Sequence, residues 1–380
     1  MRMREMTTST DTPLAVARRL VIKVGSSLLV DDQSGSIHRK WLDSLAQDIA
    51  RLRARGQEVI LVSSGAVAVG RRHLKLEPPL SLDEKQAAAA TGQIRLAHAW
   101  QEALAAHDIT VAQVLLTLED SEDRQRYLNA RTTLDTLLRL GAIPVINEND
   151  TVATAEIRFG DNDRLAARVA QMAGADTLVL FSDIDGLYTA DPRKDPSAEF
   201  LPEIRELTPE IEAMAGDPGT GYGSGGMVTK LAAARICLGA GCRMAIAMGK
   251  PLNPLAAIER GARCSWFLPQ AEPRTARKQW ILGSLKPAGT VTVDNGAARA
   301  LAKGGSLLPA GVTRVEGDFE AGDCVLVAGA DGRVLGRGLS AYAAHDATRL
   351  CGRKSMDFET VLGYRGKDEL IHRDDLVLEG

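Results

Sequence analysis

The chain has 380 residues, of which 45% are hydrophobic and 25% charged, so it can bury the cores of two or three globular domains. Its formal net charge is −3, so the chain has no overall positive charge that would attract nucleic acid. No apolar run approaches the ~18 residues that cross a bilayer, so no membrane contact is expected. Residues 1–16 resemble no secretory signal, and we expect a flexible lead there.

Between residues 17 and about 268, short apolar runs typical of strands alternate with longer helical patterns. The predicted strands span residues 20–24, 58–64, 109–117, 142–150 and 177–183. The first predicted helix has Leu42, Leu45, Ile49 and Leu52 on one face and is stopped by Gly56, and further helices are predicted at 86–106, around 128–140, from about 163, and at 230–239. This alternation is typical of an α/β domain with a mostly parallel sheet between two helix layers. Ligands of such sheets bind at the carboxyl ends of the strands.

The composition changes after Trp280, and from Ala288 the chain is Gly-rich with short β-type runs. Asp331-Gly332 between two such runs predicts a hairpin. We therefore expect a first domain at 17–270, a linker at 271–286, a small β-barrel-like domain at 287–372 and a tail at 373–380.

The five cysteines are Cys237, Cys242, Cys264, Cys324 and Cys351. Their number is odd and no CxxC pair exists, which excludes the usual zinc spacings and argues against a disulfide framework. Free thiols in the cytoplasm are the expectation.

Two predicted strands end in groups that suit phosphate. Lys23 is followed by Gly25 and two serines, which offer a cation beside free backbone N–H groups. Ser64, after the second strand, adds a hydroxyl at a helix start. A lysine snorkelling to solvent and an ordinary helix cap are the structural alternatives.

Two further segments are dense in carboxylates and amides. Asn147–Asp150 ends a strand with the sequence NEND, and residues 160–163 read GDND before a helix. Each could be a turn with side-chain hydrogen bonds. Their shared position at one edge of the sheet favours a binding site.

A glycine-rich loop, GYGSGG, precedes a helix that carries Lys230. Backbone amides at a helix N-terminus together with a lysine can cradle phosphate. The loop formally satisfies GxGxxG, but no strand precedes it and no acidic residue lies between Asp217 and Glu259. A Walker A sequence is also absent. The loop is therefore a phosphate loop of another kind, or a flexible lid.

In this order, IKVGSSLL, VSSGAVAVG, INEND, GDND, SDIDGLYTADPR and GSGGMVTK resemble the amino acid kinase family. The set is most similar to the branch that phosphorylates L-glutamate in the first step of proline biosynthesis. The tail sequences GGSLLPAGV, DFEAGDCV and IHRDDLVL resemble a PUA domain. The resemblance implies the amino acid kinase fold, ATP and Mg²⁺ as the phosphoryl donor and its metal, and no directly assigned protein ligand to the metal.

The resemblance also implies roles for single residues. Lys23 and Lys230 would bind the phosphates and the moving phosphoryl group, with Asp163 holding both lysines. The residues implied in L-glutamate binding are Ser64, Asn147, Asp150 and Asn162, with Asp150 facing the α-ammonium. The remaining residues implied in nucleotide binding are Gly25, Ser182, Asp183, Ser224, Gly225, Gly226, Met227, Val228 and Thr229.

The chemistry of the acceptor agrees with this set. A γ-carboxylate has a pKa of about 4.3, so at neutral pH it is already an anionic nucleophile and needs no general base. Direct in-line transfer is then catalysed by positioning and by cations around the phosphoryl group. The expected product is γ-glutamyl phosphate.

The resemblance further implies feedback inhibition by proline, a homo-oligomer (dimer or tetramer) and glutamate-5-semialdehyde dehydrogenase as a partner. Two alternatives stay open. Acetylglutamate or aspartate could be the acceptor, or the PUA-like tail could bind RNA. RNA binding is disfavoured because basic residues of the tail are balanced by acidic ones.

Overall fold

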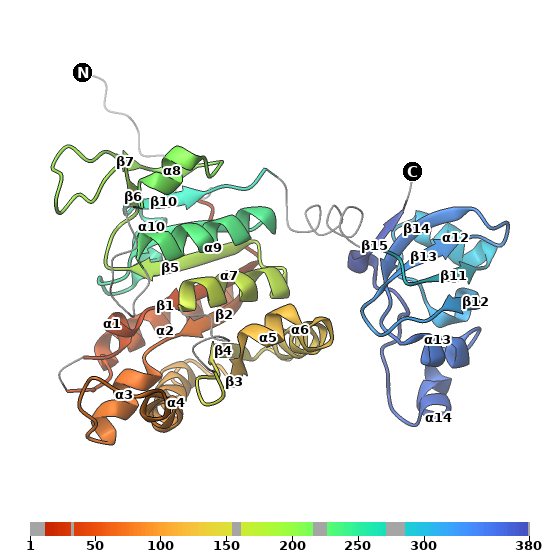
Figure 1. Cartoon of the computed structure of the whole chain (residues 1–380), viewed down its shortest axis with the longest axis horizontal. Helices are drawn as coiled ribbons and strands as arrows, with labels where there is room; N and C mark the ends of the chain where they lie inside the picture. The colour runs from red at the N-terminus through yellow and green to blue at the C-terminus, as the bar shows by residue number, and fades with distance from the viewer. Residues whose placement is uncertain (1–11, 32–33, 154–160, 216–225, 271–285, 379–380) are drawn as a thin grey trace. The chain divides into compact units, whose positions relative to one another are not determined.

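The computed structural model describes residues 12–31, 34–153, 161–215, 226–270 and 286–378 (Figure 1). The chain divides into two compact units, Met1–Pro273 and Arg274–Gly380. Each unit is built on a sheet of its own.

The first unit contains an eight-stranded sheet in the order β3-β4-β2-β1-β5-β9-β10-β8. Its strands are β1 Arg19–Val24, β2 Glu58–Ser63, β3 Val111–Leu116, β4 Ile143–Glu148, β5 Thr177–Ser182, β8 Glu203–Ile204, β9 Arg243–Met248 and β10 Cys264–Phe267. Only the β10–β9 pairing is antiparallel among these strands. The predicted mostly parallel sheet is confirmed. A separate two-stranded sheet pairs β6 Leu187–Tyr188 with β7 Phe200–Leu201.

Helices cover both faces of the large sheet (Figure 1). One face carries α1 Ser26–Leu29, α2 Arg39–Ala54, α3 Ala66–His73, α4 Leu82–Ala105 and α10 Pro254–Glu259. The other carries α5 Leu118–Glu122, α6 Arg124–Arg139, α7 Asn162–Ala173, α8 Pro209–Ala213 and α9 Met227–Gly239. Figure 1 shows α7 and α9 side by side over the sheet, where they contact each other.

The alternation of side chains along β1 places the first lysine. Leu20, Ile22 and Val24 pack into the core under α2 and α4. Val21 belongs to the opposite core, under α7 and α9. Because side chains alternate between the faces of a strand, Lys23 shares the face of Val21 and points toward α7 and α9.

Helices α4, α6 and α9 begin three or four residues earlier than their sequence patterns predicted. Helix α4 starts at Leu82 because Ser81 and Glu84 form a reciprocal capping box that satisfies the first free N–H groups. Helix α9 starts at Met227, so Lys230 lies near the end of its first turn rather than at its start.

Helices α3 and α4 cross at two glycines. A Cβ atom built on Gly70 would lie 1.7 Å from the carbonyl oxygen of Ala88, and one on Gly92 would lie 1.9 Å from that of Ala66. No side chain larger than hydrogen fits at either position while the backbones keep this spacing. The crossing secures α3, which directly follows the end of β2.

The predicted flexible lead is too long, because residues 12–16 are part of the first unit. Leu14 is fully buried in the core under α2 and α4. The Gln57 Nε2 atom donates hydrogen bonds to the carbonyl oxygens of Leu14 (3.0 Å) and Ala17 (2.6 Å). Residues 1–11 lie outside the described residues.

The second unit contains a five-stranded sheet in the order β12-β11-β13-β14-β15. Its elements are β11 Gly289–Val293, α12 Asn295–Ala302, β12 Val312–Gly317, β13 Cys324–Ala328, β14 Val334–Leu339, α13 Ala344–Leu350, α14 Phe358–Leu362 and β15 Leu376–Leu378, with short 3₁₀ turns at Pro309–Gly311, Ser355–Asp357 and Arg373–Asp375. The predicted hairpin joins β13 and β14, and Gly332 in its turn has a φ of 81°. The predicted tail at 373–380 is wrong in part, because β15 pairs with β14 through backbone hydrogen bonds. Residues 271–285 of the predicted linker lie outside the described residues.

Candidate functional site

The carboxyl ends of β1, β2, β4 and β5 bring several of the predicted polar residues to one edge of the sheet. Lys23 on β1 pairs in register with Val62 on β2 and Leu180 on β5, so the ends of these three strands are level. Helix α7 begins beside them with Asp161, whose side chain caps the helix by accepting from the Arg164 N–H at 2.8 Å. The cap places Asn162 and Asp163 in the first turn.

Asp163 holds two lysines that come from different elements. Its Oδ1 lies 2.7 Å from the Lys23 Nζ on β1, and its Oδ2 lies 3.1 Å from the Lys230 Nζ on α9. Asp163 is fully buried, and Lys23 and Lys230 are 9% and 5% exposed. One carboxylate thus fixes two ammonium groups at the edge of the sheet.

The charge state of Asp163 follows from this arrangement. Burial alone would raise its pKa, but attraction to Lys23 and Lys230 outweighs that effect and lowers the pKa below its usual value. Asp163 is therefore ionised at neutral pH. It carries one negative charge against the two positive charges of the lysines, which leaves an excess of one positive charge.

The first turn of α9 contributes further donors. Gly226 is its N-cap residue in an extended conformation and provides no side-chain cap. The Thr229 hydroxyl lies 3.0 Å from Asp163 Oδ2 and 2.8 Å from the Gly226 carbonyl oxygen, either of which can accept its one proton. Met227 and Val228 occupy the same turn. The predicted Ser224 and Gly225 lie outside the described residues.

A second cluster joins the ends of β2 and β4 to the start of α7. The Asn162 Nδ2 atom lies 2.6 Å from Ser64 Oγ, 2.9 Å from the Ser63 carbonyl oxygen and 3.0 Å from Asn147 Oδ1. Asn147 is almost fully buried, whereas Ser64 and Asn162 are half-buried. The structure therefore brings together three of the four residues implied in substrate binding.

The other predicted residues lie at or just after the ends of strands of the same sheet. Asp150 is half-buried and follows β4 by two residues. Ser182 ends β5 and its hydroxyl donates to Asp183 at 3.2 Å. Asp183 is exposed and lies 3.8 Å from Arg193. Gly25 follows β1 next to Lys23, and a Cβ built on it would lie 3.8 Å from the Lys23 Nζ, an ordinary contact distance.

Gln93 and Trp100 of α4 belong to the cluster but were missed from the sequence. Gln93 Oε1 accepts a hydrogen bond from Asn147 Nδ2 at 2.7 Å, and the Trp100 indole donates to Ser63 Oγ at 3.0 Å. A signal for Gln93 was present: it shares a helix face with the buried Ala89, Leu96 and Trp100, and a polar residue on an apolar face needs a partner.

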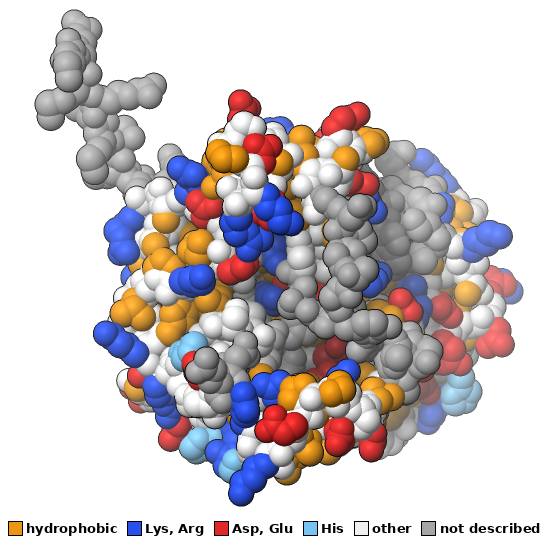
Figure 2. Space-filling model, turned by 60° about the vertical axis from the view of Figure 1, so that its left-hand side comes forward, with side chains coloured by type: hydrophobic (Ala, Val, Ile, Leu, Met, Phe, Trp, Pro, Cys, Tyr) orange, Lys and Arg blue, Asp and Glu red, His pale blue; other side chains and the backbone are white. Residues whose placement is uncertain are grey.

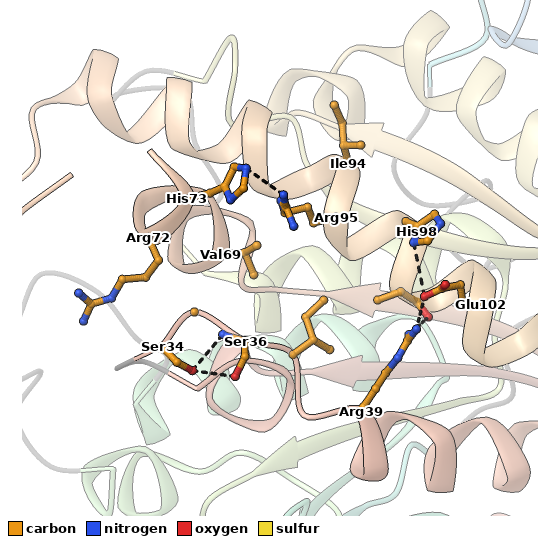
Figure 3. Close-up of a pocket in the computed structure, with 13 residues that line it drawn as sticks. Ser34, Ser36, Arg39, Val69, Arg72, His73, Ile94, Arg95, His98 and Glu102 are labelled. Atoms are coloured by element: carbon orange, nitrogen blue, oxygen red, sulfur yellow. Dashed lines mark hydrogen bonds and ion pairs between the residues drawn. The ribbon is translucent and has the colours of Figure 1, made fainter. Parts of the chain in front are cut away.

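A cavity of about 600 Å³ lies elsewhere on the first unit, between the turn at residues 34–37 and the outer sides of α3 and α4 (Figure 3). None of the residues that line it is a predicted site residue. Figure 3 shows two pairs of its polar side chains in contact, Arg95 with His73 at 2.8 Å and Arg39 with Glu102, whereas Arg72 points away from both pairs. The lysine cluster at the edge of the sheet lies outside this cavity.

Both basic and acidic side chains of the described residues are exposed in the view of Figure 2. Within the described ranges, no helix combines the length and apolarity that crossing a membrane demands.

Comparisons with known proteins identify both units. The amino acid kinase family matches residues 18–248, and the PUA domain matches residues 289–362. The glutamate 5-kinase of Paramagnetospirillum magneticum is 75% identical over 97% of this chain and its own full length. The glutamate 5-kinase of Rhodospirillum rubrum is 65% identical over 94% of this chain and 96% of its own length. That of Agrobacterium fabrum is 58% identical over 97% of this chain and 95% of its own length.

Among solved structures, the UMP kinase of Ureaplasma parvum is 16% identical, with a TM-score of 0.48 over 66% of this chain and 98% of its own. The assignment rests on the sequence relatives instead. This chain belongs to the amino acid kinase family, in its glutamate 5-kinase branch, and carries a C-terminal PUA domain.

Proposed function

We propose that this chain transfers the γ-phosphoryl group of ATP to the γ-carboxylate of L-glutamate, giving γ-glutamyl phosphate and ADP. The observation that carries the proposal is the pairing of Lys23 and Lys230 with one buried carboxylate, Asp163. Two relatives at 75% and 65% identity are named glutamate 5-kinases, which supports glutamate as the acceptor. Acetylglutamate and aspartate as acceptors are the alternatives to exclude.

In the proposed mechanism a γ-carboxylate oxygen attacks the γ-phosphorus in line with the bond to the leaving ADP oxygen. That bond breaks as the new P–O bond forms, and no proton moves. Lys23 and Lys230 offset the negative charge on the phosphates and on the attacking carboxylate, which would otherwise repel each other. Asp163 fixes both ammonium groups before the substrates arrive, so little reorganisation remains for the reaction.

Mg²⁺ fits this site as a partner of the nucleotide. Both oxygens of Asp163 face lysines at 2.7 and 3.1 Å, so this carboxylate is not available as a metal ligand while those pairs persist. A Mg²⁺ ion on the ATP phosphates would neutralise part of their charge.

For the substrate, we propose that Ser64, Asn147 and Asn162 form one side of the L-glutamate site, where the Ser64 hydroxyl donates to a carboxylate group, and that Asp150 receives the α-ammonium. Proline carries the same α-carboxylate and a secondary ammonium, so the same groups could bind it as an inhibitor. We further propose a cytoplasmic homo-oligomer, with glutamate-5-semialdehyde dehydrogenase consuming the acyl phosphate. Competition between proline and L-glutamate in steady-state kinetics would test the inhibitor site.

The experiment that tests the proposal traps the product. The protein is incubated with ATP, Mg²⁺, hydroxylamine and one acceptor at a time: L-glutamate, N-acetyl-L-glutamate or L-aspartate. We expect a hydroxamate with L-glutamate and a signal at the no-enzyme level with the other two. A hydroxamate from N-acetyl-L-glutamate or L-aspartate that exceeds the one from L-glutamate would reject the proposed acceptor.

A further inference from the structure

The hydrogen bonds that converge on Asn162 have a fixed direction. The Ser63 carbonyl oxygen, 2.9 Å from Asn162 Nδ2, can only accept, so the amide of Asn162 must turn its NH₂ group toward it. The same NH₂ group has one further proton, which Ser64 Oγ and Asn147 Oδ1 share. Turning the amide over would set two oxygens against each other at the Ser63 carbonyl.

The orientation of the Asn162 amide determines which hydrogen-bonding atoms Asn147 and Ser64 turn toward it. Asn147 must present its Oδ1 to Asn162, which leaves its own NH₂ group pointing away into the interior. Ser64 Oγ accepts from Asn162, so the hydroxyl proton of Ser64 is available to another acceptor. Within the described ranges Ser64 Oγ has no further partner in the protein, and a substrate carboxylate is an acceptor of the right kind.

Gln93, on α4, accepts a hydrogen bond from the NH₂ group of Asn147 that points away from Asn162. Asn147 is 3% exposed, so its inward NH₂ group needs an acceptor within the protein. Gln93 Oε1 supplies one at 2.7 Å, from a side chain that is 9% exposed. Without that oxygen, Asn147 would either keep an unsatisfied buried donor or rotate away from Asn162.

We propose that Gln93 is a positioning residue for substrate binding: through Asn147 and Asn162 it keeps the hydroxyl of Ser64 directed as a donor toward a carboxylate of the acceptor. The inference rests on the proposed function. It separates two halves of the site, because Lys23, Asp163 and Lys230 take no part in these hydrogen bonds. Loss of Gln93 Oε1 should weaken L-glutamate binding and leave ATP binding unchanged.

The test compares KM values in the hydroxamate assay. In Gln93→Met, which keeps the length of the side chain and removes the strong acceptor, we expect KM for L-glutamate to rise about five- to thirty-fold and KM for ATP to stay within about two-fold. Gln93→Glu keeps an acceptor oxygen in either protonation state and should restore KM for L-glutamate to within about three-fold of wild type.

Gln57→Met is the matched control. Gln57 is also a buried amide of the first unit (5% exposed), but it precedes β2 and binds Leu14 and Ala17 at the opposite end of the strand. This variant should lower the melting temperature and leave both KM values unchanged. If Gln93→Met does not fold, Gln93→Ala replaces it.

Three results would overturn the inference: an unchanged KM for L-glutamate in the folded Gln93 variant, equal rises in both KM values, or a Gln93→Glu variant as impaired as Gln93→Met. If the wild-type protein forms glutamyl hydroxamate, any of these three results overturns the role of Gln93 and leaves the proposed function intact. A wild type that forms no glutamyl hydroxamate overturns both.

Discussion

Replacing Asp163 with asparagine removes one charge from the centre of the site and keeps the shape of the side chain. The carboxylate oxygens lie 2.7 and 3.1 Å from the two ammonium nitrogens, so each attraction amounts to about 5–6 kcal/mol at an effective dielectric constant of ~20. Desolvation offsets part of this. Removing the carboxylate leaves two buried ammonium groups without a counter-charge. We therefore expect Asp163→Asn to lower the free energy of unfolding by about 3–5 kcal/mol.

Activity should fall further than stability alone explains. With the anchor gone, the two lysines repel each other and lose their positions, and we expect kcat/KM to fall about 100- to 1,000-fold. The assay is glutamyl hydroxamate formation by variant protein that is shown to be folded by circular dichroism. Urea unfolding monitored on the same samples gives the change in stability.

The pH dependence of the free energy of unfolding is a second test of the charge on Asp163. Because the pKa of Asp163 is lowered on folding, its contribution to stability is present above the unfolded pKa of about 3.9 and is lost as the pH falls through the native pKa. The stability gap between wild type and Asp163→Asn should therefore narrow at strongly acid pH.

Asp48→Asn is the control, since Asp48 is also buried but binds the backbone N–H groups of Leu255 and Ala256. It should lower stability and leave kcat/KM unchanged. A folded Asp163→Asn protein with kcat/KM within about ten-fold of wild type would refute the role of the lysine pair.

Two further predictions concern packing and thiol reactivity. Gly92→Ala should lower the free energy of unfolding in urea titration by about 3 kcal/mol or more, because the new methyl group would collide with the Ala66 carbonyl oxygen. Gly239→Ala, whose Cβ would have no atom within 4 Å, should leave the free energy of unfolding unchanged or raise it. Equal effects of the two substitutions would contradict the tight crossing of α3 and α4. Burial raises the pKa of Cys264 to about 11, so its labelling by a disulfide reagent in the native protein should keep rising up to about pH 11, and a plateau near pH 9 would contradict this. The raised pKa also means that stability is lost as the pH rises above the unfolded thiol pKa, which a urea titration series from pH 7 to 11 measures.

Local patterns in the sequence predicted five strands of the large sheet, β1 to β5, and the polar residues at their ends, but not β8, β9 and β10. Alternation along β1 determines that Lys23 faces α7 and α9, and parallel pairing makes the ends of β1, β2 and β5 level. Asp161 before α7 is an ordinary helix cap, which explains why Asp163 lies in the first turn. These short-range rules place Lys23 and Asp163 at one edge of the sheet, whereas the contact of Lys230 with Asp163 depends on how α9 packs.

The contacts that depend on helix placement could not be predicted in the same way. Gln93 and Asn147 are 54 positions apart, and their contact requires the exact depth of α4 against the sheet. That depth is set by backbone contact at Gly70 and Gly92, which periodicity does not reveal. The burial of Leu14 and the pairing of β15 likewise follow from tertiary contacts of segments with weak local patterns.

The central claim is that a carboxylate oxygen of L-glutamate attacks the γ-phosphorus of ATP. L-Glutamate labelled with ¹⁸O in its γ-carboxylate tests this most directly, in the presence of ATP, Mg²⁺ and hydroxylamine. Hydroxylamine attacks the acyl carbon of γ-glutamyl phosphate, so the bridging oxygen leaves with the phosphate. The account predicts one ¹⁸O atom in each phosphate released with hydroxamate, measured by mass spectrometry. Phosphate without ¹⁸O from a reaction that makes hydroxamate would contradict it.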